Sequence, residues 1–181
     1  MEISDKDIIA FIQIPRSKEK GFNLLLTKYQ ERLYWNIRRI VISHDDADDV
    51  LQNTFLKIWK GLDNFRADSS LYTWLYRISV NESLQHIKQN KKHHVLWADD
   101  SKDILLGKLE SDSYFDGDKI ERQLQEAIIK LPKKQRLIFN MKYYDDLKYK
   151  EISEVLGTSV GALKASYHLA VKKIEKFLKV D

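Results

Sequence analysis

The chain has 181 residues, of which 43% are hydrophobic and 32% charged, and its formal net charge is +4. This length allows one large domain or two small ones. The absence of cysteine excludes disulfides and thiolate metal sites, and no apolar run approaches the roughly 20 residues of a membrane span. The N-terminus lacks the apolar core of a signal peptide, so a soluble, cytoplasmic protein is expected. Because only two prolines and six glycines interrupt the chain, an all-α fold is expected.

Charge is distributed unevenly along the chain. Residues 1–94 contain 15 Lys/Arg and 12 Asp/Glu, residues 95–131 contain 5 and 9, and residues 132–181 contain 11 and 6. Two basic blocks therefore flank an acidic middle. This pattern fits two modules that each contact a polyanion and are joined by a segment that does not, although a split of this size also arises by chance.

The spacing of apolar residues predicts two small helical domains, residues 1–94 and 118–181, joined by a flexible linker at 95–117. The linker is rich in Asp and Ser, with at most a short docked helix near 104–109. Asp118 and Glu121 fit a capping box, and Pro132 fits the first turn of a helix. Helices are expected at about 5–14, 20–42, 45–61, 70–92, 118–130, 133–144, 148–156 and 159–178.

Residues 45–62, DDADDVLQNTFLKIWKGL, form an amphipathic helix pattern whose aspartates crowd the start, where the helix dipole favours negative charge. The apolar stripe is expected to contain Val50, Leu51, Phe55, Ile58, Trp59 and Leu62. Away from this stripe lies an acidic-polar patch made of Asp48, Asp49, Gln52 and Asn53. The patch is either a docking surface for a basic partner or a capped, solvated helix face. A calcium loop is not expected, because its glycine and distal glutamate are missing.

Residues 65–81, FRADSSLYTWLYRISVN, combine four aromatic rings with two arginines. Leu71, Leu75 and Ile78 are expected to supply a core stripe, which leaves some rings for another face. Aromatic rings with arginines between them suit single-stranded nucleic acid, because rings stack on bases and cations follow phosphates. About half of these aromatics are expected to be structural. The following HIKQNKKHH suits duplex backbone, whereas adjacent His93 and His94 diverge on a helix and are not expected to hold a metal.

Residues 151–174, EISEVLGTSVGALKASYHLAVKKI, predict a helix, a tight turn at Gly157 and a second helix capped by Thr158 or Ser159. The second helix is expected to bury Val160, Leu163, Tyr167, Ala170, Val171 and Ile174. It leaves other positions outward: Ala162, Lys164, Ala165, Ser166 and His168. This is either a helix-turn-helix, whose second helix lies in the DNA major groove, or an ordinary helical hairpin in an all-α core.

The chain combines a segment suited to unpaired bases, a helix-turn-helix pattern suited to duplex DNA and an acidic helix suited to docking. In this combination it resembles the small extracytoplasmic-function (ECF) class of bacterial sigma factors in the sigma-70 family. The resemblance rests on DDADDVLQNTFLKIWKGLDNF, FRADSSLYTWLYRISVNESLQHIKQNKK and LPKKQRLIFNMKYYDDLKYKEISEVLGTSVGALKASYHLAVKKIEKFL. It implies a sigma region 2 domain, a linker and a sigma region 4 domain. Such a factor directs RNA polymerase to promoters and helps to open them.

The resemblance also implies roles for individual residues. The β′ clamp of core RNA polymerase would be gripped by Asp48, Asp49, Gln52 and Asn53. The −10 element would be contacted by Phe65, Arg66, Ser69, Tyr72, Trp74, Asn81, Lys88, Lys91 and Lys92. The −35 element would be contacted by Ser159, Ala162, Lys164, Ala165, Ser166, His168 and Lys172. Packing, or docking on the polymerase β flap, would fall to Leu137, Phe139 and Met141.

The resemblance implies a further partner and shows one departure. Such factors are usually held by an anti-sigma protein, often membrane-bound, while the chain itself would not insert into a membrane. Members of the class often carry arginines about where Tyr167, Leu169 and Val171 stand here. Lysines one turn later, Lys172, Lys173 and Lys176, would compensate.

Two other classes remain as alternatives. A stand-alone helix-turn-helix regulator would bind DNA without polymerase. An enzyme is not expected, because the carboxylates lack an accompanying nucleophile–base pair, phosphate loop or metal signature. No cofactor and no metal are expected.

Overall fold

The computed structural model describes residues 3–89 and 119–179, and these residues form eight α-helices and two short 3-10 helices. The described residues contain no β-strand, so the prediction of an all-α fold is confirmed. Contacts divide the chain into two compact units, Met1–His86 and Ile87–Asp181, and each is described by itself. The expected linker and its short helix, the Asp118 cap, Lys91, Lys92 and the histidine pair lie outside the described residues.

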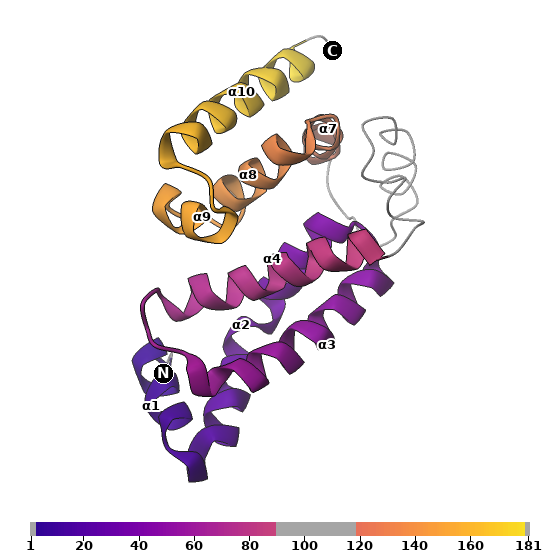
Figure 1. Cartoon of the computed structure of the whole chain (residues 1–181). Coiled ribbons are helices and arrows are strands. Elements are labelled where there is room, and N and C mark those ends of the chain that lie inside the picture. The colour runs from indigo at the N-terminus through magenta and orange to yellow at the C-terminus, as the bar shows by residue number, and fades with distance from the viewer. Residues whose placement is uncertain (1–2, 90–118, 180–181) are drawn as a thin grey trace. The chain divides into compact units, whose positions relative to one another are not determined.

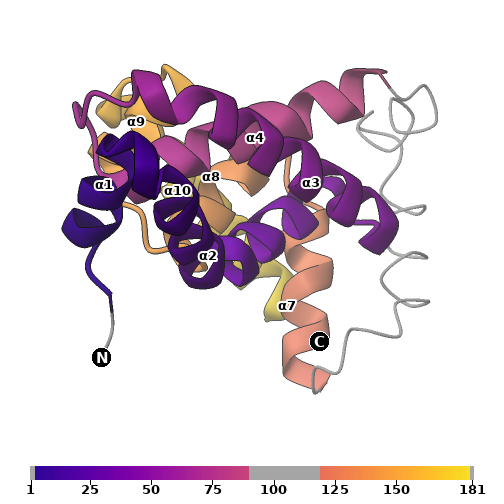
Figure 2. The same ribbon diagram turned by 90° about the horizontal axis from the view of Figure 1, so that it is seen from below.

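The first unit is built around the long helix α2 (Lys18–Val41). Helices α1 (Asp5–Gln13) and α3 (His44–Gly61) pack against α2, and α4 (Leu71–Gln89) completes the unit (Figures 1 and 2). The 3-10 turns Pro15–Ser17 and Leu62–Asn64 connect α1 to α2 and extend the end of α3. Its fully buried side chains include Ile8, Leu25, Leu33, Ile37, Ile58, Leu71, Leu75 and Tyr76.

Local sequence explains how these helices begin and meet. Ser4 caps α1 in a reciprocal capping box with Asp7, which satisfies N–H groups that have no partner within the helix. Gly21 lets α2 approach α1 closely, since a Cβ at this position would lie 2.8 Å from Cγ1 of Ile12. In the core, the Ser79 hydroxyl donates to Oδ1 of Asn36 at 3.0 Å and so links α4 to α2.

The buried stripe of α3 differs from the expected one. The buried residues of the helix are Ala47, Val50, Thr54 and Ile58, whereas Leu51 and Phe55 are only partly buried and Leu56 is 59% exposed. Thr54 is buried, and its hydroxyl donates to the carbonyl oxygen of Val50 at 2.7 Å, which offsets the cost of burying a polar group. Val50, Ile58 and Leu62 of the expected stripe are buried as expected, whereas Leu51 and Phe55 are only partly buried and Trp59 is 37% exposed.

The second unit contains α7 (Lys119–Ile129), α8 (Lys133–Tyr143), α9 (Tyr149–Leu156) and α10 (Val160–Leu178). Helix α10 packs against the other three. A hydrophobic cluster closes this unit and contains Ala127, Ile128, Leu131, Phe139, Ala170 and Ile174. Pro132 is the residue before α8 and adopts extended backbone, so it lies one position ahead of the expected first turn.

Candidate nucleic-acid and partner interfaces

The acidic-polar patch lies on the surface of α3. Asp49, Gln52 and Asn53 are exposed, and the side chain of Asp48 is 50% exposed. Asp48 and Asp49 lie three to four positions before Gln52 and Asn53, so all four share the side of the helix opposite the buried stripe. The structure therefore gathers all four predicted residues on one accessible face.

Two histidines hold the first turn of α3 beside this patch. The ring of His44 lies between the hydroxyl of Tyr34, 2.7 Å from its Nδ1, and a carboxylate oxygen of Asp48, 3.6 Å from its Nε2. From the other side, Nε2 of His86 in α4 lies 3.0 Å from Asp46. Asp46 is thus engaged inside the unit, a difference from Asp48 that the sequence did not reveal.

Helix α4 is buried over a wider face than the sequence indicated. Tyr72 is 8% exposed, and Tyr76 is fully buried. The Tyr72 ring stacks on Tyr29 at a centroid distance of 5.7 Å, and the guanidinium carbon of Arg32 lies 3.9 Å from its centroid. The resemblance to ECF sigma factors assigned Tyr72 to the −10 element, and in this structure its ring packs in the core of the unit.

The two remaining aromatics, Phe65 before α4 and Trp74 in its first turn, form a partly buried pair. Phe65 lies 5.1 Å from Trp74, whose indole lies against Gly61, where a Cβ would come within 3.2 Å. Arg66 is exposed, while Ser69 is partly buried. Two of the four aromatics are therefore buried and two are partly accessible, as expected from the sequence.

The outer face of α4 carries a polar stripe. Asn81 and Lys88 are exposed and seven positions apart, which places them on one side of the helix. Arg77 and Gln85 are also exposed and share this side, at four-residue intervals from Asn81. Arg77 was not among the residues expected to contact the −10 element, although its four-residue spacing from Asn81 was a sequence signal for this shared side.

The turn between α9 and α10 has the predicted geometry. Gly157 adopts φ 60° and ψ 30°, and its N–H donates to the carbonyl oxygen of Ser153 at 2.9 Å. Of the two candidate caps, it is Ser159 that caps α10, by accepting from the N–H of Ala162 at 3.4 Å. Gly157 thus ends α9 in the left-handed conformation that favours glycine.

Helix α10 presents the expected residues outward. Leu163, Ala170 and Ile174 are buried, and Val160, Tyr167 and Val171 are partly buried against the unit. Ser166 is partly exposed, and the rest of the predicted −35 set is exposed: Ser159, Ala162, Lys164, Ala165, His168 and Lys172. Of the three residues assigned to packing or β-flap docking, Phe139 and Met141 are buried and Leu137 is partly buried.

Tyr167 has a structural role where the class often has an arginine. Its ring stacks on Phe139 of α8 at 5.7 Å and meets Tyr149 of α9 edge-on at 6.3 Å. Desolvation by burial raises the pKa of Tyr167, because it disfavours the charged phenolate. Nζ of Lys164 lies 5.8 Å from the ring centroid of Tyr149, which places this cation near the first residue of α9.

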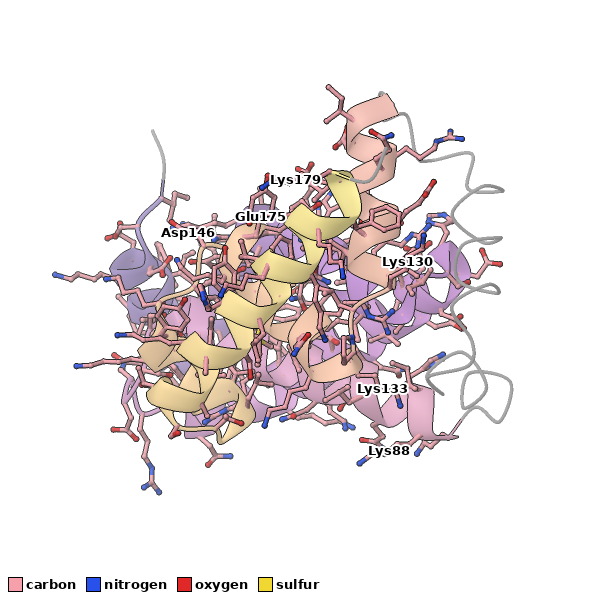
Figure 3. The ribbon with its side chains drawn as sticks, turned by 90° about the horizontal axis from the view of Figure 1, so that it is seen from above. Lys88, Lys130, Lys133, Asp146, Glu175 and Lys179 are labelled. Atoms are coloured by element: carbon pink, nitrogen blue, oxygen red, sulfur yellow. The ribbon has the colours of Figure 1, made fainter. Side chains whose placement is uncertain are left out.

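Lysines surround the second unit. Exposed lysines on α10 are Lys164, Lys172, Lys173 and Lys176, and Lys179 follows its last residue. Nζ of Lys173 donates to the side-chain carbonyl of Gln135 in α8 at 3.0 Å. Lys130 and Lys133, labelled in Figure 3, lie at the connection between α7 and α8. This surface charge favours a polyanionic partner.

The described part of the chain contains no group of three or more His, Cys, Asp or Glu residues placed to hold a metal ion. None of its helices combines the length and hydrophobicity needed to cross a bilayer.

Comparisons with known proteins match both units. The family model for sigma-70 region 2 matches residues 25–93, and the model for sigma-70 region 4 matches residues 121–174. The RNA polymerase sigma-H factor of Pseudomonas aeruginosa is 31% identical over 96% of this chain and 93% of its own. The ECF RNA polymerase sigma factor SigW of Bacillus subtilis is 27% identical over 92% of this chain and 94% of its own.

Solved structures share the fold. CnrH, solved in complex with the cytosolic domain of CnrY, has a TM-score of 0.70 at 22% identity and covers 98% of both chains. The sigma factor RpoE of Bartonella quintana, solved with the anti-sigma factor NepR, has a TM-score of 0.67 at 21% identity over 90% of this chain and 99% of its own.

A helical unit matching region 2, followed by a helix-turn-helix unit matching region 4, defines an RNA polymerase sigma factor. The chain belongs to the sigma-70 family. Within that family it is an ECF sigma factor, which directs RNA polymerase to promoters and is not a stand-alone regulator.

Proposed function

We propose that the exposed face of α3 binds core RNA polymerase at its β′ clamp. The observation that supports this assignment is that α3 has a buried side and, opposite it, an accessible side with the acidic-polar patch. Val50, Thr54 and Ile58 face the core, while the acidic-polar patch is accessible and lies within the region 2 match. Because the carboxylates and amides of the patch provide acceptors and donors, a partner with basic and polar groups fits it.

The −10 element is contacted by the outer face of α4 and the segment before it. Asn81 and Lys88 supply an amide and a cation on the same exposed side of the helix, and Arg77 extends that stripe. Phe65 and Trp74 present the accessible parts of their rings beside Arg66. Binding to an unpaired base then offsets the few kcal/mol that base flipping costs, so binding free energy opens the promoter.

The −35 element is read by the first half of α10. Ala162 and Ala165 allow close approach to base edges, and Lys164 contacts phosphate or a base. Lys172 and the lysines that follow it supply charge further along the helix. The chain itself breaks no bond in this mechanism, and it acts where the polymerase acts, in the cytoplasm.

An anti-sigma protein is the natural regulator of such a factor. The fold relatives CnrH and RpoE were solved in complex with CnrY and the anti-sigma factor NepR, respectively. A comparable protein, either soluble or anchored in a membrane, would control this chain by covering the surfaces that polymerase and DNA require.

Run-off transcription with purified core polymerase tests these assignments. Asn81→Ala and Lys164→Ala are expected to lower promoter-specific transcription and to leave core binding unchanged, because both residues face DNA. Asp49→Asn is expected to weaken core binding itself. Asn23→Ala, which changes an exposed asparagine of α2 outside all three surfaces, is the matched control. Full transcription by the Asn81 and Lys164 variants would contradict the DNA-contact assignments.

A further inference from the structure

Three polar groups from α2 and the start of α3 form a chain that ends at the acidic-polar patch. Tyr34 lies in α2, His44 is the first residue of α3, and Asp48 follows one turn later. The Tyr34 hydroxyl lies 2.7 Å from Nδ1 of His44, and Nε2 of the same ring lies 3.6 Å from Oδ2 of Asp48. The second distance exceeds a hydrogen bond, so the contact is electrostatic.

The chemistry of the imidazole ring gives this chain a direction. If His44 is neutral and the Tyr34 hydroxyl donates to Nδ1, the ring proton resides on Nε2 and points toward the Asp48 carboxylate. If the ring is protonated, Nδ1 donates to the phenol oxygen, and Nε2 again presents a proton. Both states therefore attract the Asp48 carboxylate toward the ring.

The neighbouring aspartate is used differently. Asp46 has a side chain that is 17% exposed, and its carboxylate meets His86 of α4 at 3.0 Å. This contact ties α3 to the core of the unit. Asp48 remains 50% exposed although it is anchored by His44. Two aspartates near the start of α3 therefore have different environments: Asp46 pairs inside the unit, whereas Asp48 is held beside His44 at the surface.

We propose that Tyr34 and His44 are positioning residues for the interface with RNA polymerase, because they orient the Asp48 carboxylate before the partner arrives. This inference rests on the proposed role of the acidic-polar patch. A side chain that is ordered in advance loses less conformational freedom on binding. For one side chain this corresponds to roughly a two- to tenfold gain in affinity.

The test uses the full chain and equilibrium binding to core polymerase. Tyr34→Phe keeps the ring, which packs edge-on against Trp35 at 5.3 Å and His44 at 6.0 Å, and removes only the hydroxyl. We expect Tyr34→Phe to weaken binding about two- to tenfold. In a double-mutant cycle, adding Tyr34→Phe to Asp48→Asn is expected to cause no further loss, because the oriented carboxylate is already gone.

Tyr29→Phe is the matched control. It removes a hydroxyl from the same helix, and that hydroxyl donates to Asp5 at 2.5 Å, in a contact with α1 and not with the patch. Its affinity for core polymerase is expected to match that of the unchanged protein. An equal loss of affinity in Tyr29→Phe and Tyr34→Phe would overturn the proposal, because it would show a general loss of stability.

The single variants separate this inference from the function on which it rests. If Asp48→Asn binds core polymerase normally, the role of Asp48 in the patch is refuted and the positioning role is refuted with it. If Asp48→Asn weakens binding while Tyr34→Phe does not, or if the two losses are additive, the patch stands and the positioning role alone is refuted.

Discussion

Replacing Gly157 by alanine tests the backbone geometry of the helix-turn-helix. Gly157 ends α9 at φ 60°, in the left-handed region, and a Cβ placed there meets no atom within 4 Å. The substitution therefore adds no steric clash with neighbouring residues, and its cost comes from the backbone alone. Left-handed geometry costs an L-residue roughly 1–2 kcal/mol, so we expect the free energy of opening of this turn to fall by about that amount.

Gly161 offers a control with the same added methyl group. It lies within α10, and a Cβ at this position also meets nothing within 4 Å. Because alanine is the better helix former, Gly161→Ala is expected to stabilise α10 by up to about 1 kcal/mol. The two variants should therefore change stability in opposite directions.

Amide hydrogen exchange on the full chain is the appropriate assay. It reports the opening of α9 and α10 separately from the first unit, whereas a single unfolding curve for a chain of two units need not be two-state. A loss of 1–2 kcal/mol corresponds to exchange faster by about 5- to 30-fold at the protected amides near the turn. Unchanged exchange in Gly157→Ala, or equal effects of the two substitutions, would refute the left-handed turn as the origin of the cost.

Three further predictions concern stability. Ser159→Ala removes the cap of α10 and should lower protection of its first turn by about 1 kcal/mol, measured by hydrogen exchange; no loss would argue against the cap. Leu75→Ala, at a fully buried position, should cost about 2–5 kcal/mol in denaturant unfolding of the first unit, and a loss below 1 kcal/mol would contradict its burial. Burial and the hydrogen bond to Asp5 raise the pKa of Tyr29 above its ordinary value of 10.0. The unfolded state then loses this proton first, so stability should fall as the pH rises above about 10, and Tyr29→Phe should reduce that loss in pH-dependent unfolding.

Much of the helical architecture could be predicted because it depends on local chemistry. The expected ranges 45–61, 133–144, 148–156 and 159–178 each agree with a helix of the structure to within one residue at either end. Gly157 identified the turn because few other residues adopt its conformation without cost, and Ser159 was one of two named caps. The exposed positions of α10 followed from helical periodicity once its buried residues were recognised.

The register of the first unit was harder to predict. In α3 the sequence offered Leu51 and Phe55 as core residues, but the structure buries Thr54, whose hydroxyl donates to a carbonyl oxygen within the same helix. Neighbouring apolar residues permit several overlapping stripes, and hydrophobicity alone does not select among them. The contacts with the adjacent helix make that selection.

The sequence by itself determined the helices, their order and the tight turn, since backbone preferences and periodicity are encoded within a few neighbouring residues. Only the tertiary structure decided which polar and aromatic side chains remain available to a partner. Tyr72 is withdrawn into the core by Tyr29, and Asp46 is turned inward by His86, while Asp48 stays at the surface beside His44. These outcomes depend on residues distant along the chain, because burial and pairing are properties of the packed helices and not of any single one.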